Sequence, residues 1–78
     1  MKNVKIQITR EMVDAVFSRP EFFNRFPDAK KAREVCEMRL AGATYKEIGK
    51  RFDKSVYFSS NIVDKCVRLY LVFVAERD

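Results

Sequence analysis

Residues 40–55, LAGATYKEIGKRFDKS, contain the strongest local signals in this chain. Thr44 and Glu47 have the spacing of a capping box, in which each side chain bonds the free backbone N–H of the other at a helix start. Apolar or small residues then recur at helical spacing, at Tyr45, Ile48, Gly49 and Phe52. The pattern predicts a short helix that begins after Thr44 and ends near Asp53.

A second helix is predicted directly after this one. Ser55 is placed to cap it, and a line of apolar residues runs along its length. This line consists of Phe58, Ile62, Cys66, Leu69 and Phe73. Two helices joined by about three residues have the layout of a helix-turn-helix. Gly49 stands at the crossing, where a side chain larger than alanine would keep the helices apart. We therefore predict a mainly α, small helical bundle with a helix-turn-helix at residues 44–68.

Residues 40–55 resemble the entry to the helix-turn-helix of sigma-factor region 4, of LuxR-type regulators, and of small phage and resolvase DNA-binding domains. Those families share leucine, any residue, glycine, any residue, threonine, any residue, lysine-glutamate-isoleucine and a small residue, which here is LAGATYKEIG. The resemblance implies a recognition helix from Val56 to about Arg68 that enters the DNA major groove.

The chain departs from the family pattern after Ser55. Asp53 stands at the turn position usually given to glycine, and Ser59 stands where those families bury an aliphatic residue. Val56 and Phe58 replace the basic residues usually found early on the recognition helix. A register shifted by one residue, with Phe58 facing inward, is the alternative that would restore apolar packing.

The resemblance also implies which side chains meet DNA. Asn61 would bond adenine, Ser60 would reach a base edge, and Tyr57 would meet a phosphate or a thymine methyl. Basic side chains around the motif would hold phosphates, while Asp64 would be repelled unless a neighbouring cation offsets it. The full DNA-binding set is Lys46, Lys50, Arg51, Lys54, Ser55, Tyr57, Ser60, Asn61, Lys65 and Arg68.

Three further helix starts are predicted upstream. Thr9 is placed to cap a helix over residues 10–17. Ser18 would cap a following helical turn, with Glu21 as its capping-box partner. Asp28 would cap a longer helix that ends at Gly42.

Two other features of this half remain ambiguous from pattern alone. Residues 4–8 alternate apolar with polar, which predicts a short strand or an extended arm. Phe22, Phe23 and Phe26 lie close together in sequence. We interpret them as core residues, although a stacking platform for bases is the alternative.

Length and composition limit the function classes. A chain of 78 residues is a single domain and too short for a Rossmann or barrel fold. Its net charge of +5 favours an anionic partner such as nucleic acid. With no histidine, two glycines and two separate cysteines, Cys36 and Cys66, it lacks the usual means of building a metal site, a phosphate loop or an acid–base centre. We expect no enzyme, no metal and no cofactor, and buried reduced thiols.

The sequence also bears on location. The N-terminus lacks the apolar segment of a signal peptide, and no apolar run is long enough to span a membrane. We therefore expect a cytoplasmic protein without a membrane partner.

Residues 66–75 are apolar at every position except Arg68. Helix is favoured for this block, and a strand buried on both faces is the alternative. Because so short a chain can hardly cover the block, we expect a homodimer joined through residues 66–76, with residues 4–8 contributing. The expected dimer contacts are Leu69, Tyr70, Val72 and Phe73.

Two functions fit these features. The first is a small, phage-like transcription regulator that binds double-stranded DNA as a dimer. The second is a phage-like inhibitor or adaptor that docks on a host complex, such as RNA polymerase or a CRISPR-type immunity complex, through Val56, Tyr57 and Phe58. Exposure of Val56 and Tyr57 away from basic side chains would favour the protein partner, and basic neighbours would favour DNA. A structural subunit of a larger assembly is a third alternative.

Overall fold

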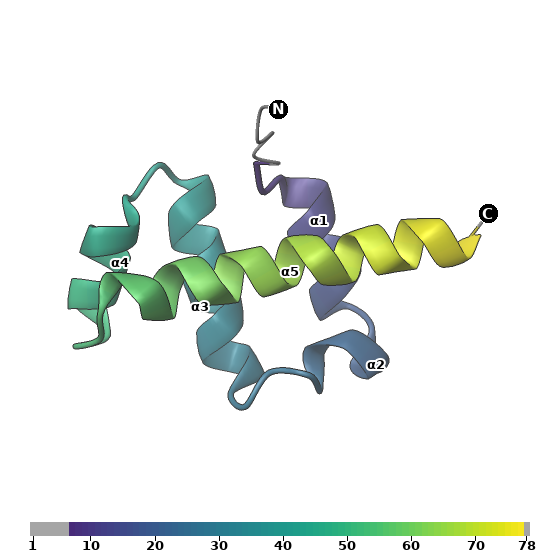
Figure 1. Ribbon diagram of the computed structural model, residues 1–78, viewed down its shortest axis with the longest axis horizontal. Helices are drawn as coiled ribbons and strands as arrows, with labels where there is room; N and C mark the ends of the chain where they lie inside the picture. Colours follow the sequence, from purple (N-terminus) through teal and green to yellow (C-terminus); the bar gives the residue numbers. More distant parts are fainter. Residues whose placement is uncertain (1–6, 78) are drawn as a thin grey trace, which may run out of the picture.

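The last helix of the chain lies across the helices that precede it (Figure 1). The computed structural model describes residues 7–77. Its helices are α1 (Arg10–Phe17), α2 (Pro20–Phe23), α3 (Ala29–Leu40), α4 (Tyr45–Arg51) and α5 (Val56–Arg77). The first part of α5 packs on α4, and α3 and α1 pack along the rest of it. No strand occurs within residues 7–77, and the predicted mainly α bundle is confirmed.

Side-chain caps set the starts of α1 and α3, as predicted. The hydroxyl of Thr9 accepts a hydrogen bond from the Met12 N–H at 3.2 Å, and the carboxylate of Asp28 accepts one from the Lys31 N–H at 3.1 Å. At its other end α3 stops at Leu40, two residues before the predicted Gly42. Gly42 follows in the left-handed conformation, with φ of 104°, which a glycine adopts without steric cost.

The predicted cap at Ser18 is wrong. An N-cap residue needs extended backbone, but Ser18 is helical, with φ of −94° and ψ of −5°, and it closes α1. Its hydroxyl donates to the Ala15 carbonyl at 3.2 Å. Arg19 is the extended residue before α2, and Glu21 forms an ion pair with Arg19 at 3.6 Å instead of a capping box.

The C-terminal block is helical, as the favoured interpretation had it. α5 continues through Arg68 to Arg77 as one helix of 22 residues. A helix of that length spans about 33 Å, which is most of the 39 Å long dimension of the molecule. The predicted recognition helix and the predicted dimerisation segment are therefore two parts of one continuous helix.

The core lies where α5 meets α1, α3 and α4. Its fully buried members are small or branched, and aromatic rings fill the end near α2. Phe17 stacks on Phe26 with ring centres 5.2 Å apart, and Phe22 meets Phe73 edge to face at 6.1 Å. Phe22 and Phe26 are thus core residues, as predicted, and Phe23 is half-buried against them.

The two cysteines are buried and free, as predicted. Cys36 comes from α3 and Cys66 from α5. The hydrogen-bonding neighbour Cys66, and then burial, raise the pKa of the Cys36 thiol well above its usual range. A thiol in this state is a poor nucleophile, because the thiolate is the reactive form.

The predicted strand or arm at residues 4–8 lies mostly outside the described residues. Gln7 and Ile8 belong to neither a helix nor a strand, and Ile8 packs against the core.

Candidate nucleic-acid interface

The start and the end of α4 are both fixed by local hydrogen bonds. The predicted capping box is complete, with Thr44 Oγ1 accepting from the Glu47 N–H at 3.1 Å and Glu47 Oε1 accepting from the Thr44 N–H at 2.8 Å. At the other end, the Lys54 N–H donates to the Gly49 carbonyl at 2.7 Å, and the Asp53 N–H donates to the Lys50 carbonyl at 3.2 Å. This pair of bonds is a Schellman motif.

Asp53 occupies the left-handed position of that motif, with φ of 57°. Most residues with a Cβ are disfavoured there, and aspartate is one of the few that tolerate it. The departure from glycine at this position therefore leaves the tight turn intact.

Gly49 lets the turn and the start of α5 approach α4 closely. A Cβ at this position would lie 2.8 Å from the Lys54 carbonyl oxygen and 2.7 Å from that of Ser55. Both contacts are with backbone, which cannot swing aside as a side chain would. The predicted need for a small residue at the crossing is confirmed, and it is stricter than expected, because even alanine would clash.

Ser59 and Phe58 are both shielded from solvent near the start of α5. Ser59 is completely buried, at the position where those families bury an aliphatic side chain. Its hydroxyl has no hydrogen-bond partner among residues 7–77. Phe58 is half-buried beside it, with its ring 6.0 Å from that of Phe52. Phe58, the inward residue of the alternative register, also packs against the core.

We call α4, the turn after it and the start of α5 the α4–α5 unit. Four exposed cations lie on α4 and the turn. Lys46, Lys50 and Arg51 lie on α4, and Lys54 lies in the turn. Within residues 7–77 none of them forms an ion pair, and only Arg51 has a ring neighbour, Phe52 at 5.2 Å. The arginines at positions 10, 19, 33 and 68 are all paired with carboxylates. Unneutralised positive charge is therefore available around α4 and the turn.

The start of α5 exposes predicted contact residues. The Ser55 hydroxyl accepts from the Phe58 N–H at 3.4 Å, which confirms it as the cap of α5. Tyr57 is 72% exposed, Val56 is 42% exposed, and Asn61 is exposed. Ser60 is half-buried, and its hydroxyl donates to the Tyr57 carbonyl at 3.4 Å.

Lys65 and Arg68, the predicted DNA contacts further along α5, both interact with other groups of the same chain. The Lys65 ammonium donates to the Arg25 carbonyl at 2.7 Å and lies 5.3 Å from the centre of the Phe26 ring. Arg68 forms an ion pair with Asp64 at 2.9 Å. Arg68 is therefore the neighbouring cation that offsets the charge of Asp64. Because its own charge is partly neutralised by this pair, Arg68 would bind a phosphate less strongly.

Three of the four expected dimer contacts, Leu69, Tyr70 and Phe73, also make contacts within the chain. Leu69 is only 8% exposed, the Tyr70 hydroxyl lies 3.0 Å from a Glu11 carboxylate oxygen, and Phe73 contacts Phe22. Tyr70 thus contacts α1 and Phe73 contacts α2, while Leu69 belongs to the buried core. Val72 is 46% exposed, and the neighbouring Leu71, which the sequence analysis did not single out, is 42% exposed.

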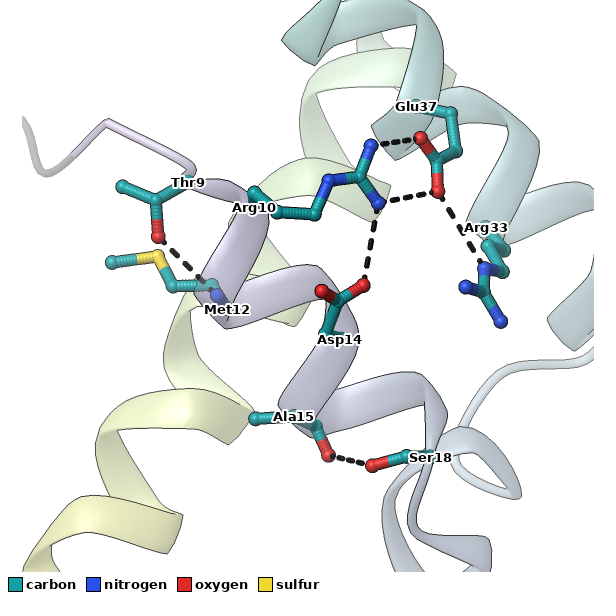
Figure 2. A network of polar contacts seen from close by, with 8 residues as sticks. All are labelled: Thr9, Arg10, Met12, Asp14, Ala15, Ser18, Arg33 and Glu37. Atoms are coloured by element: carbon teal, nitrogen blue, oxygen red, sulfur yellow. Dashed lines mark hydrogen bonds and ion pairs between the residues drawn. The ribbon is translucent and has the colours of Figure 1, made fainter.

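A charged network ties α1 to α3 (Figure 2). The Arg10 guanidinium forms two hydrogen bonds with the Glu37 carboxylate, one of them at 2.8 Å, and a third with Asp14 at 3.3 Å. Arg33 approaches the same Glu37 carboxylate at 3.6 Å. Arg10 holds the pKa of Glu37 below its usual value. No local pattern could have revealed the contact between Arg10 and Glu37, because these residues are 27 positions apart.

Comparisons with protein-family models, with curated proteins and with solved structures give no match to this chain. No helix in the described part of the chain is both long and apolar enough to cross a membrane. Within residues 7–77, no three metal-ligating side chains gather into a group that could hold a metal ion.

Proposed function

We propose that this protein is a small, non-enzymatic DNA-binding regulator that presents the first half of α5 to the major groove. The observation that carries the proposal is the set of four unpaired cations on α4 and the turn, next to the exposed start of α5. Lysine and arginine without protein partners release the counterions of DNA when they meet phosphates, and this release dominates affinity.

The close crossing at Gly49 supports the same function. It holds α4 and the start of α5 in one rigid unit, so that phosphate contacts from α4 would fix the register of α5 on the duplex. Tyr57 and Asn61 would then reach base edges, with the Asn61 amide suited to adenine. Lys46, Lys50, Arg51 and Lys54 would hold the flanking phosphates, while Lys65 and Arg68 would contribute less because they are engaged within the chain.

Fluorescence anisotropy with a random-sequence duplex pool tests this proposal. We expect binding that weakens steeply with salt. The double variant Lys46→Gln/Lys50→Gln should lower the slope of log K against log salt by about two, since each lost phosphate contact removes about one.

A matched control uses two exposed cations outside the α4–α5 unit. The variant Arg25→Gln/Lys30→Gln changes the net charge by the same amount and should leave the slope close to that of the parent protein. Equal losses for both variants would indicate binding through total charge alone, and no binding at low salt would refute the proposal.

A second function, docking on a partner protein, is favoured by the outward face of α5. Tyr57, Asn61, Asp64 and Arg68 follow one another at the spacing of one helix face, and the only cation among them is paired with Asp64. Tyr57 at 72% exposure is the kind of aromatic residue that anchors protein interfaces. A nuclease-resistant partner in a pull-down from the native host, lost with Tyr57→Ala, would support an inhibitor or adaptor of a host complex.

A homodimer belongs to the DNA-binding proposal, because two recognition helices about 34 Å apart meet successive major grooves. The exposed Leu71 and Val72 are the residues left for such a contact once Leu69, Tyr70 and Phe73 are used within the chain. The proposal also places the protein in the cytoplasm, where its DNA target would be accessible. A monomer by solution scattering at millimolar concentration would exclude this dimer.

A further inference from the structure

A groove runs between the start of α3, the turn after α4 and the first half of α5. In Figure 1 the turn before α5 lies at the left end of that helix, and the loop before α3 lies below it. The groove has a volume of about 350 Å³, within the range of sites that bind ligands. Its walls come from three separate segments of the chain, held by the core beneath them.

The floor of the groove is apolar and preformed. It is built mainly from Phe26, Phe58 and Ile62. Phe26 is stacked on Phe17 at 5.2 Å, and Phe58 lies 6.0 Å from Phe52. Because these rings are fixed by their neighbours, a ligand would lose little affinity to ordering the site.

The rim of the groove is mainly basic. Lys54 from the turn and Lys31 from α3 both line it, and the Lys31 ammonium lies 6.0 Å from the centre of the Phe52 ring. Asp28 is the acidic lining residue, and its carboxylate already accepts the Lys31 N–H as the cap of α3. The Asn61 amide lies at the rim and makes no hydrogen bond within residues 7–77. An anionic ligand with an apolar part therefore complements the groove.

We propose that this groove binds an acidic peptide segment of a partner protein. One apolar side chain of the segment fills the space over Phe26, Phe58 and Ile62, and carboxylates on either side of it meet Lys31 and Lys54. The DNA backbone would satisfy the two lysines but would leave the apolar floor in contact with water, so a peptide accounts for both parts of the lining. The groove shares Lys54 and Asn61 with the proposed DNA contacts, whereas Lys31 belongs to the groove alone. Peptide binding does not require DNA.

NMR titration of the ¹⁵N-labelled protein tests the proposal. The probe is a capped hexapeptide with a leucine-phenylalanine pair flanked by glutamates, and the control peptide carries lysines in place of the glutamates. We expect saturable shifts of the Lys31, Lys54, Phe58 and Asn61 amides with the acidic peptide only. Shifts with both peptides, or none at millimolar concentration, would overturn the proposal.

Two charge reversals separate this site from DNA binding. Lys31→Glu should weaken the acidic peptide by about tenfold, since it places a like charge beside the ligand. Glutamate suits that position in the first turn of a helix capped by aspartate, so the fold is kept. Lys46→Glu, on α4, should leave peptide affinity within about twofold, because it lies outside the groove.

Duplex DNA provides the opposite pattern. Lys46→Glu should weaken DNA and Lys31→Glu should not. If Lys31→Glu weakens DNA instead of the peptide, the groove belongs to the DNA interface and the peptide proposal is wrong.

Discussion

Replacement of Gly49 by alanine tests how closely α4 and α5 must approach. The new Cβ would lie 2.7 Å and 2.8 Å from two backbone oxygens and 3.0 Å from the Ser55 carbonyl carbon. Relief requires the turn to move away from α4, which stretches the 2.7 Å bond from the Lys54 N–H to the Gly49 carbonyl. Overpacking of this kind costs about 1 to 3 kcal/mol, and a weakened hydrogen bond adds about 1 kcal/mol. The higher helix propensity of alanine returns about 1 kcal/mol.

We therefore expect Gly49→Ala to lower the free energy of unfolding by about 2 kcal/mol. For a domain of this size the melting temperature should fall by roughly 8 to 16 °C. Circular dichroism during thermal and urea unfolding measures both quantities. The control is Lys50→Ala, at the following residue, whose side chain is exposed. It should change the free energy of unfolding by less than about 0.5 kcal/mol. Unchanged or increased stability of Gly49→Ala would refute the close approach.

Three further predictions concern single side chains. Ser59→Ala should raise the free energy of unfolding by about 1 kcal/mol, because it removes a buried hydroxyl that has no partner, and a decrease in urea denaturation would contradict this. Asp53→Gly should raise it by roughly 1 kcal/mol at the left-handed position, whereas Asp53→Val should lower it, as paired thermal melts would show. The Arg10–Glu37 contact lowers the pKa of Glu37, so its stabilisation is present above pH 4.5 or so and is lost as pH falls through the folded-state pKa. The stability difference between the parent protein and Glu37→Gln should accordingly shrink between about pH 6 and pH 3, and a difference independent of pH would exclude this linkage.

The sequence predicted features that depend on a few neighbouring residues. The caps at Thr9, Asp28, Thr44 and Ser55 are of this kind, because an N-cap side chain bonds a backbone N–H only two or three positions away. Ser18 misled the same reasoning, since the backbone there continues α1 and leaves the extended conformation to Arg19.

Contacts between residues far apart in the chain could not be predicted from the sequence. An apolar run such as residues 66–75 has the same pattern whether a second copy or the chain's own α1 and α2 cover it. Phe73, for example, meets Phe22, which lies 51 positions earlier and beyond any helical periodicity. The same holds at the candidate interface, where no sequence pattern indicated that Lys65 would bond the Arg25 carbonyl, 40 positions away. The Arg68–Asp64 pair, by contrast, has the four-residue spacing of a local helical ion pair. For Lys65, the sequence indicated a positive charge but not whether the side chain would be free to bind a phosphate.

Chemical-shift mapping with duplex DNA tests the central claim most directly. The ¹⁵N-labelled protein is titrated with a random-sequence duplex at low salt, and the perturbed amides are placed on the fold. We predict the largest shifts at Lys46, Lys50, Arg51, Lys54 and Tyr57, with little change along the Arg10–Glu37 network. No shifts, or shifts confined to the far end of α5 around Leu71 and Val72, would contradict a DNA-binding role for the α4–α5 unit.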